Sequence, residues 1–314
     1  MSEVVPPMAG PRPPQPGAWR PPGADSAVRG RRPVPLGRTL LRALDPRLTR
    51  QVRAERAQHE ALAARLRPGS SVAVVGLAPQ AGRSTVTAVL ALALAQHQSP
   101  LTIDTGAGVY GRLARWPGGS AHAVLTGIGV RGVDPDGPRP PGVGYRWLRQ
   151  RLALSDEVML LGSDPSLGEA PVAAAEYPAT VRALGRWFSV IVTDTPRLSN
   201  ESVVPAAVAL ADCVVVVGPD DDHGGQWVST CLPWIASVGS ERVGQQVLGV
   251  LVQHEESRTV RTWPDFPIPM SVLPFDPALA RPGPVTWYAL AERTRDAATA
   301  LAAQVASALR APSP

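Results

Sequence analysis

Apolar runs and amphipathic segments alternate along most of this 314-residue chain. Runs such as SVAVV, FSVIV and DCVVVV are unbroken and rich in valine and isoleucine, which predicts strands buried on both faces of a parallel sheet. The segments between these runs carry apolar residues at helical spacing. The alternation predicts a doubly wound α/β fold: a mostly parallel sheet with helices on both faces and crevices at the carboxyl ends of the strands.

Each predicted element has a place in the sequence. Strands are expected at 71–77, 100–104, 157–163, 188–196, 211–219, 246–253 and 270–277. Helices are expected at 84–96, 108–116, 177–187, 203–211, 226–238 and 287–309. A loop rich in glycine and proline is expected between 116 and 144.

Two stretches precede this alternating region. Residues 1–35 are rich in proline and arginine and cannot bury an apolar face, so we expect a disordered arm with polyproline II character. Residues 36–69 contain a basic segment with helical periodicity after Pro46, which we interpret as a helical lead-in. The α/β domain is then expected to span 70–311.

Composition narrows the function classes only slightly. The chain has 31 basic and 26 acidic residues, and every basic residue is an arginine because the sequence contains no lysine. This bias is typical of GC-rich coding sequence, so an arginine at a lysine position can reflect codon usage. The net charge of +5 is modest. The basic arm could contact DNA or a membrane, but we favour a solvated tail.

The apolar runs and the cysteines indicate a cytoplasmic protein. No apolar run reaches the roughly 20 residues that a membrane-spanning helix needs, and the N-terminus lacks the apolar core of a signal peptide. Cys213 and Cys231 are isolated, which predicts buried thiols in a reducing compartment rather than a disulfide or a metal site.

The stretch GLAPQAGRST, residues 76–85, joins a predicted strand to a predicted helix. In a phosphate-binding loop, backbone N–H groups and the helix N-terminus face the phosphates, a lysine reaches them and a hydroxyl holds Mg²⁺. Gly82 could supply the turn, and Ser84 or Thr85 the hydroxyl. The pattern is imperfect because Leu77 stands at the first glycine position and Arg83 at the lysine position. An ordinary strand–helix turn therefore stays an alternative.

Acidic residues end two further predicted strands, Asp104 in LTIDTGAG and Asp194 in VIVTDTP. Because parallel strands end at the same edge of a sheet, these carboxylates are expected beside the loop, where either could bind Mg²⁺. Each could instead cap a helix. The triple acid at 220–222 is interpreted as a solvated turn, with help in metal binding as the alternative.

These motifs, in this order, resemble the MinD/ParA group of P-loop ATPases with a deviant Walker A loop, most closely its actinobacterial branch associated with type VII secretion. The resemblance covers roughly 50–309 and includes IDTGAGVYGRLARW, FSVIVTDTP and LPFDPALARPGPVTWYAL. It implies that 70–311 is a P-loop NTPase-like domain.

The resemblance implies ATP and Mg²⁺ as ligands and assigns residues to them. Nucleotide-binding positions are Gly82, Arg83, Ser84, Thr85, Gln253, Pro274 and Asp276. Metal-binding positions are Ser84, Asp104 and Asp194, and catalytic positions are Arg83, Asp104 and Asp194. It also implies a protein partner in a secretion or partitioning complex and a nucleotide-dependent homodimer.

Departures from the family pattern predict weak or absent ATP hydrolysis. The signature lysine of the family falls on Ala78, its paired glycines on Pro79 and Gln80, and a water-positioning acid on Gly106. Pro79 has no N–H to offer a phosphate. We therefore expect a degenerate, cytoplasmic ATPase-like protein that acts as a scaffold or regulator. An active, dimerising ATPase that uses Arg83 is the alternative, and a related P-loop kinase or ligase ranks third.

Overall fold

A computed structural model of the chain describes residues 46–106, 113, 121–130, 144–156, 158–162, 170–200, 202–239, 246–256, 265–281 and 285–310. The arm predicted for 1–35 lies outside these residues, as does the helix predicted for 108–116 apart from Leu113. The chain divides into two compact units, Met1–Arg53 and Ala54–Pro314, and the sheet belongs to the second.

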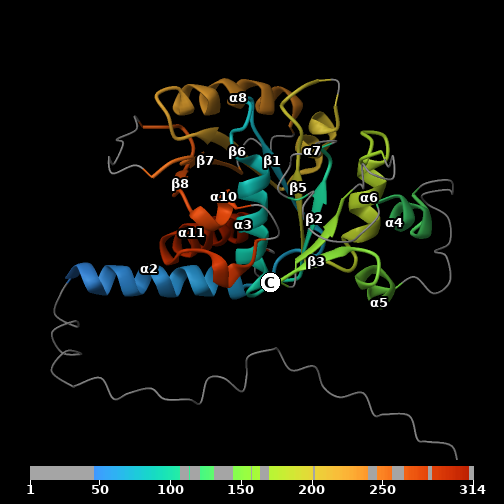
Figure 1. Ribbon diagram of the computed structural model, residues 1–314, viewed down its shortest axis with the longest axis horizontal. Helices are drawn as coiled ribbons and strands as arrows, with labels where there is room; N and C mark the ends of the chain where they lie inside the picture. The colour runs from blue at the N-terminus through green and yellow to red at the C-terminus, as the bar shows by residue number, and fades with distance from the viewer. Residues whose placement is uncertain are drawn as a thin grey trace, which may run out of the picture. The chain divides into compact units, whose positions relative to one another are not determined.

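An eight-stranded sheet organises the second unit, in the order β3-β4-β2-β5-β1-β6-β7-β8 (Figure 1). The strands are β1 Ser70–Val75, β2 Pro100–Asp104, β3 Ala153–Ser155, β4 Val158–Leu161, β5 Val190–Asp194, β6 Cys213–Pro219, β7 Val247–Val252 and β8 Met270–Leu273. All neighbouring pairs are parallel except β3 with β4 at one edge. The α/β fold with a mostly parallel sheet is confirmed.

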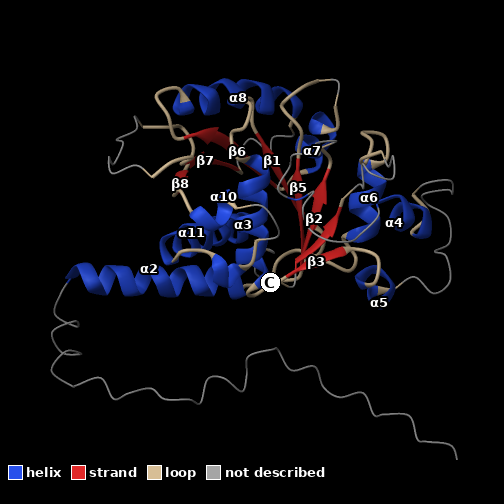
Figure 2. Cartoon of the chain, viewed as in Figure 1, coloured by secondary structure: helices blue, strands red, loops and turns tan. Residues whose placement is uncertain are grey.

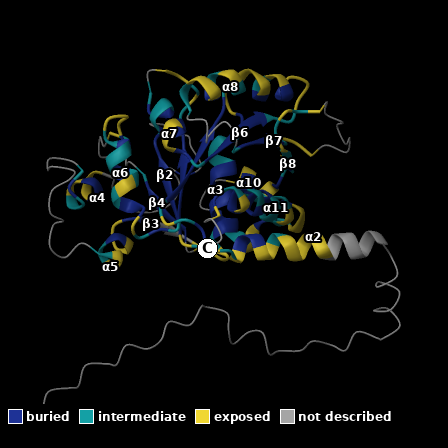
Figure 3. Cartoon of the chain, turned by 180° about the vertical axis from the view of Figure 1, so that it is seen from behind, coloured by how far each residue is buried: buried dark blue, intermediate teal, exposed yellow. Residues whose placement is uncertain are grey.

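Helices cover both faces of this sheet, as Figure 2 shows in blue beside the red strands. The helices are α2 Pro46–Ala63, α3 Arg83–Ala95, α4 Ala121–Gly127, α5 Tyr145–Arg149, α6 Tyr177–Leu184, α7 Val204–Leu210, α8 Gly224–Val238, α10 Pro277–Ala280, the 3₁₀ turn η4 Trp287–Ala289 and α11 Glu292–Ala308. One core cluster joins the sheet to α3 and α11, and the other joins it to α6, α7 and α8. All residues of β1, β2, β4, β5 and β7 are buried (Figure 3).

Two local predictions were wrong. The loop expected between 116 and 144 contains α4, and the helix expected from residue 287 begins at Glu292, after η4. The short elements α5, β3 and α10 were not predicted. A helix or strand of so few residues offers too little periodicity to be recognised against glycine- and proline-rich neighbours.

The strand order places the phosphate-loop candidate at the centre of the sheet. Strand β1 lies between β5 and β6, so the chain leaves β1 toward one half of the sheet and later returns to the other half. Ligands of open α/β sheets bind outside the carboxyl ends of the strands, at the point where the strand order reverses. The loop after β1 occupies that point.

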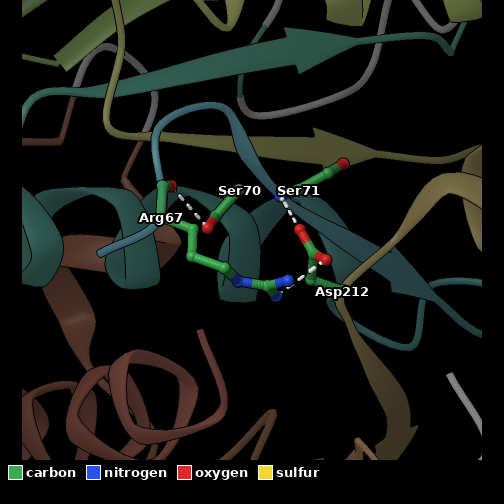
Figure 4. A network of polar contacts seen from close by, with 4 residues as sticks. All are labelled: Arg67, Ser70, Ser71 and Asp212. Atoms are coloured by element: carbon green, nitrogen blue, oxygen red, sulfur yellow. Dashed lines mark hydrogen bonds and ion pairs between the residues drawn. The ribbon is translucent and has the colours of Figure 1, made fainter. Parts of the chain in front are cut away.

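An ion pair between Arg67 and Asp212 joins the chain at the amino ends of β1 and β6, on the side of the sheet opposite the loop (Figure 4). The Arg67 guanidinium donates to Asp212 Oδ1 at 2.9 Å, and Asp212 Oδ2 accepts the Ser71 N–H at 3.0 Å. The Ser70 hydroxyl donates to the Arg67 carbonyl at 2.7 Å. This network ties the start of β1 to the residue before β6 and so fixes the two strands that flank the central crevice.

Two smaller observations complete the fold. Cys213 and Cys231 are free and buried, as predicted. Within the described ranges, the helices are all too short or too polar to cross a membrane.

Candidate functional site

The loop between β1 and α3 turns through two residues with left-handed backbone. Gln80 has φ 53° and Gly82, the residue before α3, has φ 91°. A Cβ at Gly82 would lie 3.0 Å from Val252 Cγ1, so glycine is required by both conformation and space. The first backbone bond of α3 runs from Val86 N–H to Gly82 O at 2.8 Å. The residues between Gly82 and Val86 form the first turn of α3, and backbone N–H groups at a helix N-terminus favour an anion.

Arg83, at the lysine position, folds back onto this loop. Its Nη1 donates to the Gly76 carbonyl at 2.9 Å and to the Ala78 carbonyl at 3.3 Å. Burial lowers the pKa of Arg83, and the nearby charge of Asp194 acts against that shift. The guanidinium charge is therefore already engaged by backbone oxygens of the loop.

Asp104 and Asp194 lie side by side at the carboxyl ends of β2 and β5, in paired register positions. The Ser84 hydroxyl donates to Asp194 Oδ2 at 2.5 Å, and the Gly106 N–H donates to Asp104 Oδ1 at 2.8 Å. Asp194 Oδ1 is buried and has no hydrogen-bond partner among the described residues. The first turn of α3 and both strand-end acids thus form one cluster.

Burial changes the acidity of this pair. It raises the pKa of Asp104 to about 6, although the Gly106 N–H lowers it. Burial also raises the pKa of Asp194 to about 7; the negative charge of Asp104 adds to this shift and the Ser84 hydroxyl opposes it. A divalent cation would relieve the repulsion, and a hydroxyl with two carboxylates is a donor set that suits Mg²⁺. Ser84, Asp104 and Asp194 therefore fit a magnesium ion.

A threonine after each acid holds the strand ends together. Thr105 Oγ1 donates to the Asp194 carbonyl at 2.8 Å, and Thr195 Oγ1 donates to the Val74 carbonyl at 2.7 Å. These bonds connect the end of β2 to β5 and the end of β5 to β1, so they fix the positions of the two acids relative to the loop. The Asp-Thr pair that ends both strands in the sequence is the local signal for this arrangement.

A pocket of about 100 Å³ opens beside the cluster. It is lined by Thr85, Val252, Gln253, His254, Leu273, Pro274, Phe275, Asp276, Leu279 and Ala280. Four of the residues proposed to contact a nucleotide, Thr85, Gln253, Pro274 and Asp276, therefore share one cavity. Thr85 follows Ser84 in the first turn of α3, so the pocket and the acid cluster are adjacent.

Two of the pocket's polar side chains are committed to the protein itself. The Asp276 carboxylate accepts the N–H of Ala278 and the N–H of Ala291, each at 2.8 Å. Gln253 Nε2 donates to Asp220 Oδ2 at 2.9 Å. Asp276 therefore shapes the pocket wall by holding α10 and the start of α11, with each carboxylate oxygen accepting one backbone N–H.

Sequence reasoning missed Arg197 and did not foresee the role of Asp220. Asp220, first of the triple acid, orients Gln253 through the bond just described, whereas Asp221 Oδ1 caps the backbone of the same turn by accepting the His223 N–H at 2.9 Å. Arg197 follows Asp194 by three residues, and its Nε donates to the Leu77 carbonyl at 2.9 Å. Nothing in the local pattern distinguishes Arg197 from other exposed arginines.

Comparisons with known proteins bear on the fold. No protein-family model and no curated protein matches the chain in sequence. Among solved structures, the chain is similar to a ParA family ATPase from Chlorobium tepidum TLS, with a TM-score of 0.53 and 15% identity over 74% of this chain and 98% of that one. A second similar structure is the septum site-determining protein MinD from Pyrococcus horikoshii OT3, complexed with Mg-ADP, with a TM-score of 0.49 and 19% identity over 74% of this chain and 94% of that one. The likeness to the ParA family ATPase supports a P-loop NTPase fold.

Proposed function

We propose that this chain is a MinD/ParA-like protein that binds ATP and Mg²⁺ at the loop after β1 and hydrolyses ATP slowly or not at all. In this proposal it acts in the cytoplasm as a scaffold or regulator of a secretion or partitioning complex. The observation that carries the proposal is the engagement of Arg83 with the carbonyls of Gly76 and Ala78. A cation that already binds the loop carbonyls gives less stabilisation to the negative charge that develops on a phosphate during hydrolysis.

Nucleotide binding is supported by features that do not depend on Arg83. The first turn of α3 offers backbone N–H groups, and Ser84, Asp104 and Asp194 fit Mg²⁺. The pocket around Gln253 and Pro274 lies next to that turn, which gives a base a place beside the phosphates. ATP and Mg²⁺ are therefore the ligands that we propose.

Slow hydrolysis is supported by the charges that the loop lacks. Ala78 is 2% exposed and apolar, so this position brings no cation to the site. Gly106 has no side chain to orient an attacking water and donates its N–H to Asp104. Removing one positioned transition-state donor typically costs on the order of 10²-fold in rate, and this chain lacks two groups of that kind.

An active, dimerising ATPase is the second candidate. Only Nη1 of Arg83 bonds to the loop, so the rest of the guanidinium fork remains a donor that could reach a phosphate. In this case the chain would dimerise with ATP and cycle on and off its partner. The similar structure from Chlorobium tepidum TLS is described as a ParA family ATPase, which makes turnover worth measuring directly.

Calorimetry and a phosphate-release assay separate these candidates. We expect the full chain to bind ATP with Mg²⁺ and to release phosphate no faster than Arg83→Ala, with the exposed Arg186→Ala as the matched control. Turnover above background that disappears in Arg83→Ala would overturn the scaffold proposal. If turnover is absent, a double variant with Ala78→Lys and Arg83→Lys tests whether the missing charges alone explain the loss.

A further inference from the structure

The segment after β5 rests on the loop after β1 through two hydrogen bonds. Arg197 Nε donates to the Leu77 carbonyl at 2.9 Å, and the Leu198 N–H donates to the Gly76 carbonyl at 3.2 Å. Both contacts come from residues that closely follow Asp194. The segment that ends β5 therefore places both Asp194 and Arg197 beside the loop. Arg197 is thereby held at the edge of the proposed phosphate site.

Two guanidinium groups thus bind three consecutive carbonyls. Arg83 takes those of Gly76 and Ala78, and Arg197 takes the one between them, at Leu77. The groups are within electrostatic reach: burial is the main reason for the lowered pKa of Arg83, Asp194 opposes the shift and Arg197 adds to it. Like charges held this close favour an anion between or beside them.

The two arginines differ in what remains free. Arg83 is half-buried, and Asp194 offsets part of its charge. Arg197 is exposed, only its Nε is engaged, and its two Nη groups have no partner among the described residues. A guanidinium fixed through Nε presents the rest of its fork outward, which suits bidentate contact with phosphate oxygens.

The negative charge of a bound triphosphate is one that the Nη groups of Arg197 could help to neutralise. A triphosphate brings several negative charges to a cluster that already contains Asp104 and Asp194, and Mg²⁺ neutralises only part of them. The chain has no lysine, and Ala78 is apolar. A second cation beside the loop would offset more of this charge, and Arg197 lies at the loop through its bond to the Leu77 carbonyl.

We propose that Arg197 is a phosphate-binding residue that contacts the polyphosphate chain of a bound nucleoside triphosphate from within the same subunit. The proposal rests on the proposed function, since it assigns a residue to that ligand.

The substitution Arg197→Gln tests this role while keeping a donor for the structural hydrogen bond to the Leu77 carbonyl. Glutamine Nε2 lies as many bonds from the backbone as arginine Nε, so it can still donate to the Leu77 carbonyl while the charge and the fork are lost. The full-length wild type, Arg197→Gln, Arg197→Ala and Arg186→Ala are compared by calorimetry with Mg-ATP and with magnesium and inorganic tripolyphosphate. Arg186 is an exposed arginine between α6 and β5, at the opposite edge of the sheet.

We expect Arg197→Gln and Arg197→Ala to weaken the binding of both ligands about tenfold or more, and Arg186→Ala to leave it unchanged. If Arg197→Gln binds both ligands like the wild type, Arg197 only supports the loop through Leu77. This proposal is then overturned while the proposed function stands. If the wild type binds tripolyphosphate but not ATP, and Arg197→Gln abolishes that binding, nucleotide binding fails and the role of Arg197 survives. Wild type that binds neither ligand overturns both.

Discussion

Asp104 and Asp194 are partners in the β2–β5 register, so their carboxyl groups lie side by side at the edge of the sheet where the phosphate loop begins. One of them, Asp194, also accepts the Ser84 hydroxyl from the first turn of α3. Three segments that are far apart in sequence therefore meet in one cluster. Burying two neighbouring carboxyls is unfavourable without a cation, and sites of this kind are typical of functional regions.

The first prediction concerns the pH dependence of stability. For a carboxyl whose pKa is raised by folding, the folded state keeps a proton that the unfolded state releases, so the free energy of unfolding falls as pH rises. The loss begins above the ordinary carboxyl pKa of 3.8 and is complete above the folded pKa values of about 6 for Asp104 and about 7 for Asp194. Asp194→Asn removes one charge and keeps an acceptor for Ser84.

We therefore expect Asp194→Asn to melt a few degrees above the wild type at about pH 8, with a difference that shrinks toward about pH 5. Thermal melts in magnesium-free buffer measure this, with the exposed Asp221→Asn as control. A constant offset across the pH range would contradict the assignment of the shift to this buried pair.

The second prediction concerns Gly82. Substitution by alanine places a Cβ at φ 91° and 3.0 Å from Val252 Cγ1, so we expect a loss of about 1–2 kcal/mol in the free energy of unfolding. Gly144→Ala is the matched control, because its φ is −153° and nothing lies within 4 Å of the new Cβ. Urea unfolding of the two variants should differ; equal midpoints would argue against strain at Gly82.

A third prediction follows from the two bonds of the Asp276 carboxylate. Asp276→Ala leaves the N–H groups of Ala278 and Ala291 without their acceptor, which should cost about 2–4 kcal/mol and loosen the pocket wall. Chemical denaturation measures the loss, and Mg-ATP calorimetry at a temperature where the variant is folded measures the pocket. The exposed Asp265→Ala is the control. An unchanged midpoint for Asp276→Ala would show that these bonds contribute no net stability.

The fourth prediction separates stability from ligand binding. Asp212→Ala leaves the Arg67 guanidinium and the Ser71 N–H unpaired at the amino end of β1, and we expect a cost of about 2–3 kcal/mol. The exposed pair of Arg56 and Glu60 provides a contrast, since Glu60→Ala should cost below about 1 kcal/mol. Because the network lies at the edge opposite the loop, ATP affinity of folded Asp212→Ala should equal that of the wild type. A large change in affinity would show coupling across the sheet.

The sequence by itself determined the fold class and the edge at which the site lies. Unbroken runs of valine and isoleucine specify strands that are buried on both faces, and the helices between them force parallel neighbours. Since parallel strands all end at one edge, the residues after β1, β2 and β5 had to emerge at the same edge whatever the order of the strands. Periodicity and chain direction are local properties, and a single sequence contains them.

Only the tertiary structure decided which groups touch. That β5 lies between β1 and β2, and so sets Asp194 against both Asp104 and Ser84, depends on contacts between distant segments. The same holds for Arg83 turning onto the loop carbonyls and for Arg197 reaching Leu77. A flexible side chain takes the direction in which its charge and hydrogen bonds are best satisfied, and its partners are fixed by the packing of the whole sheet rather than by its neighbours in sequence.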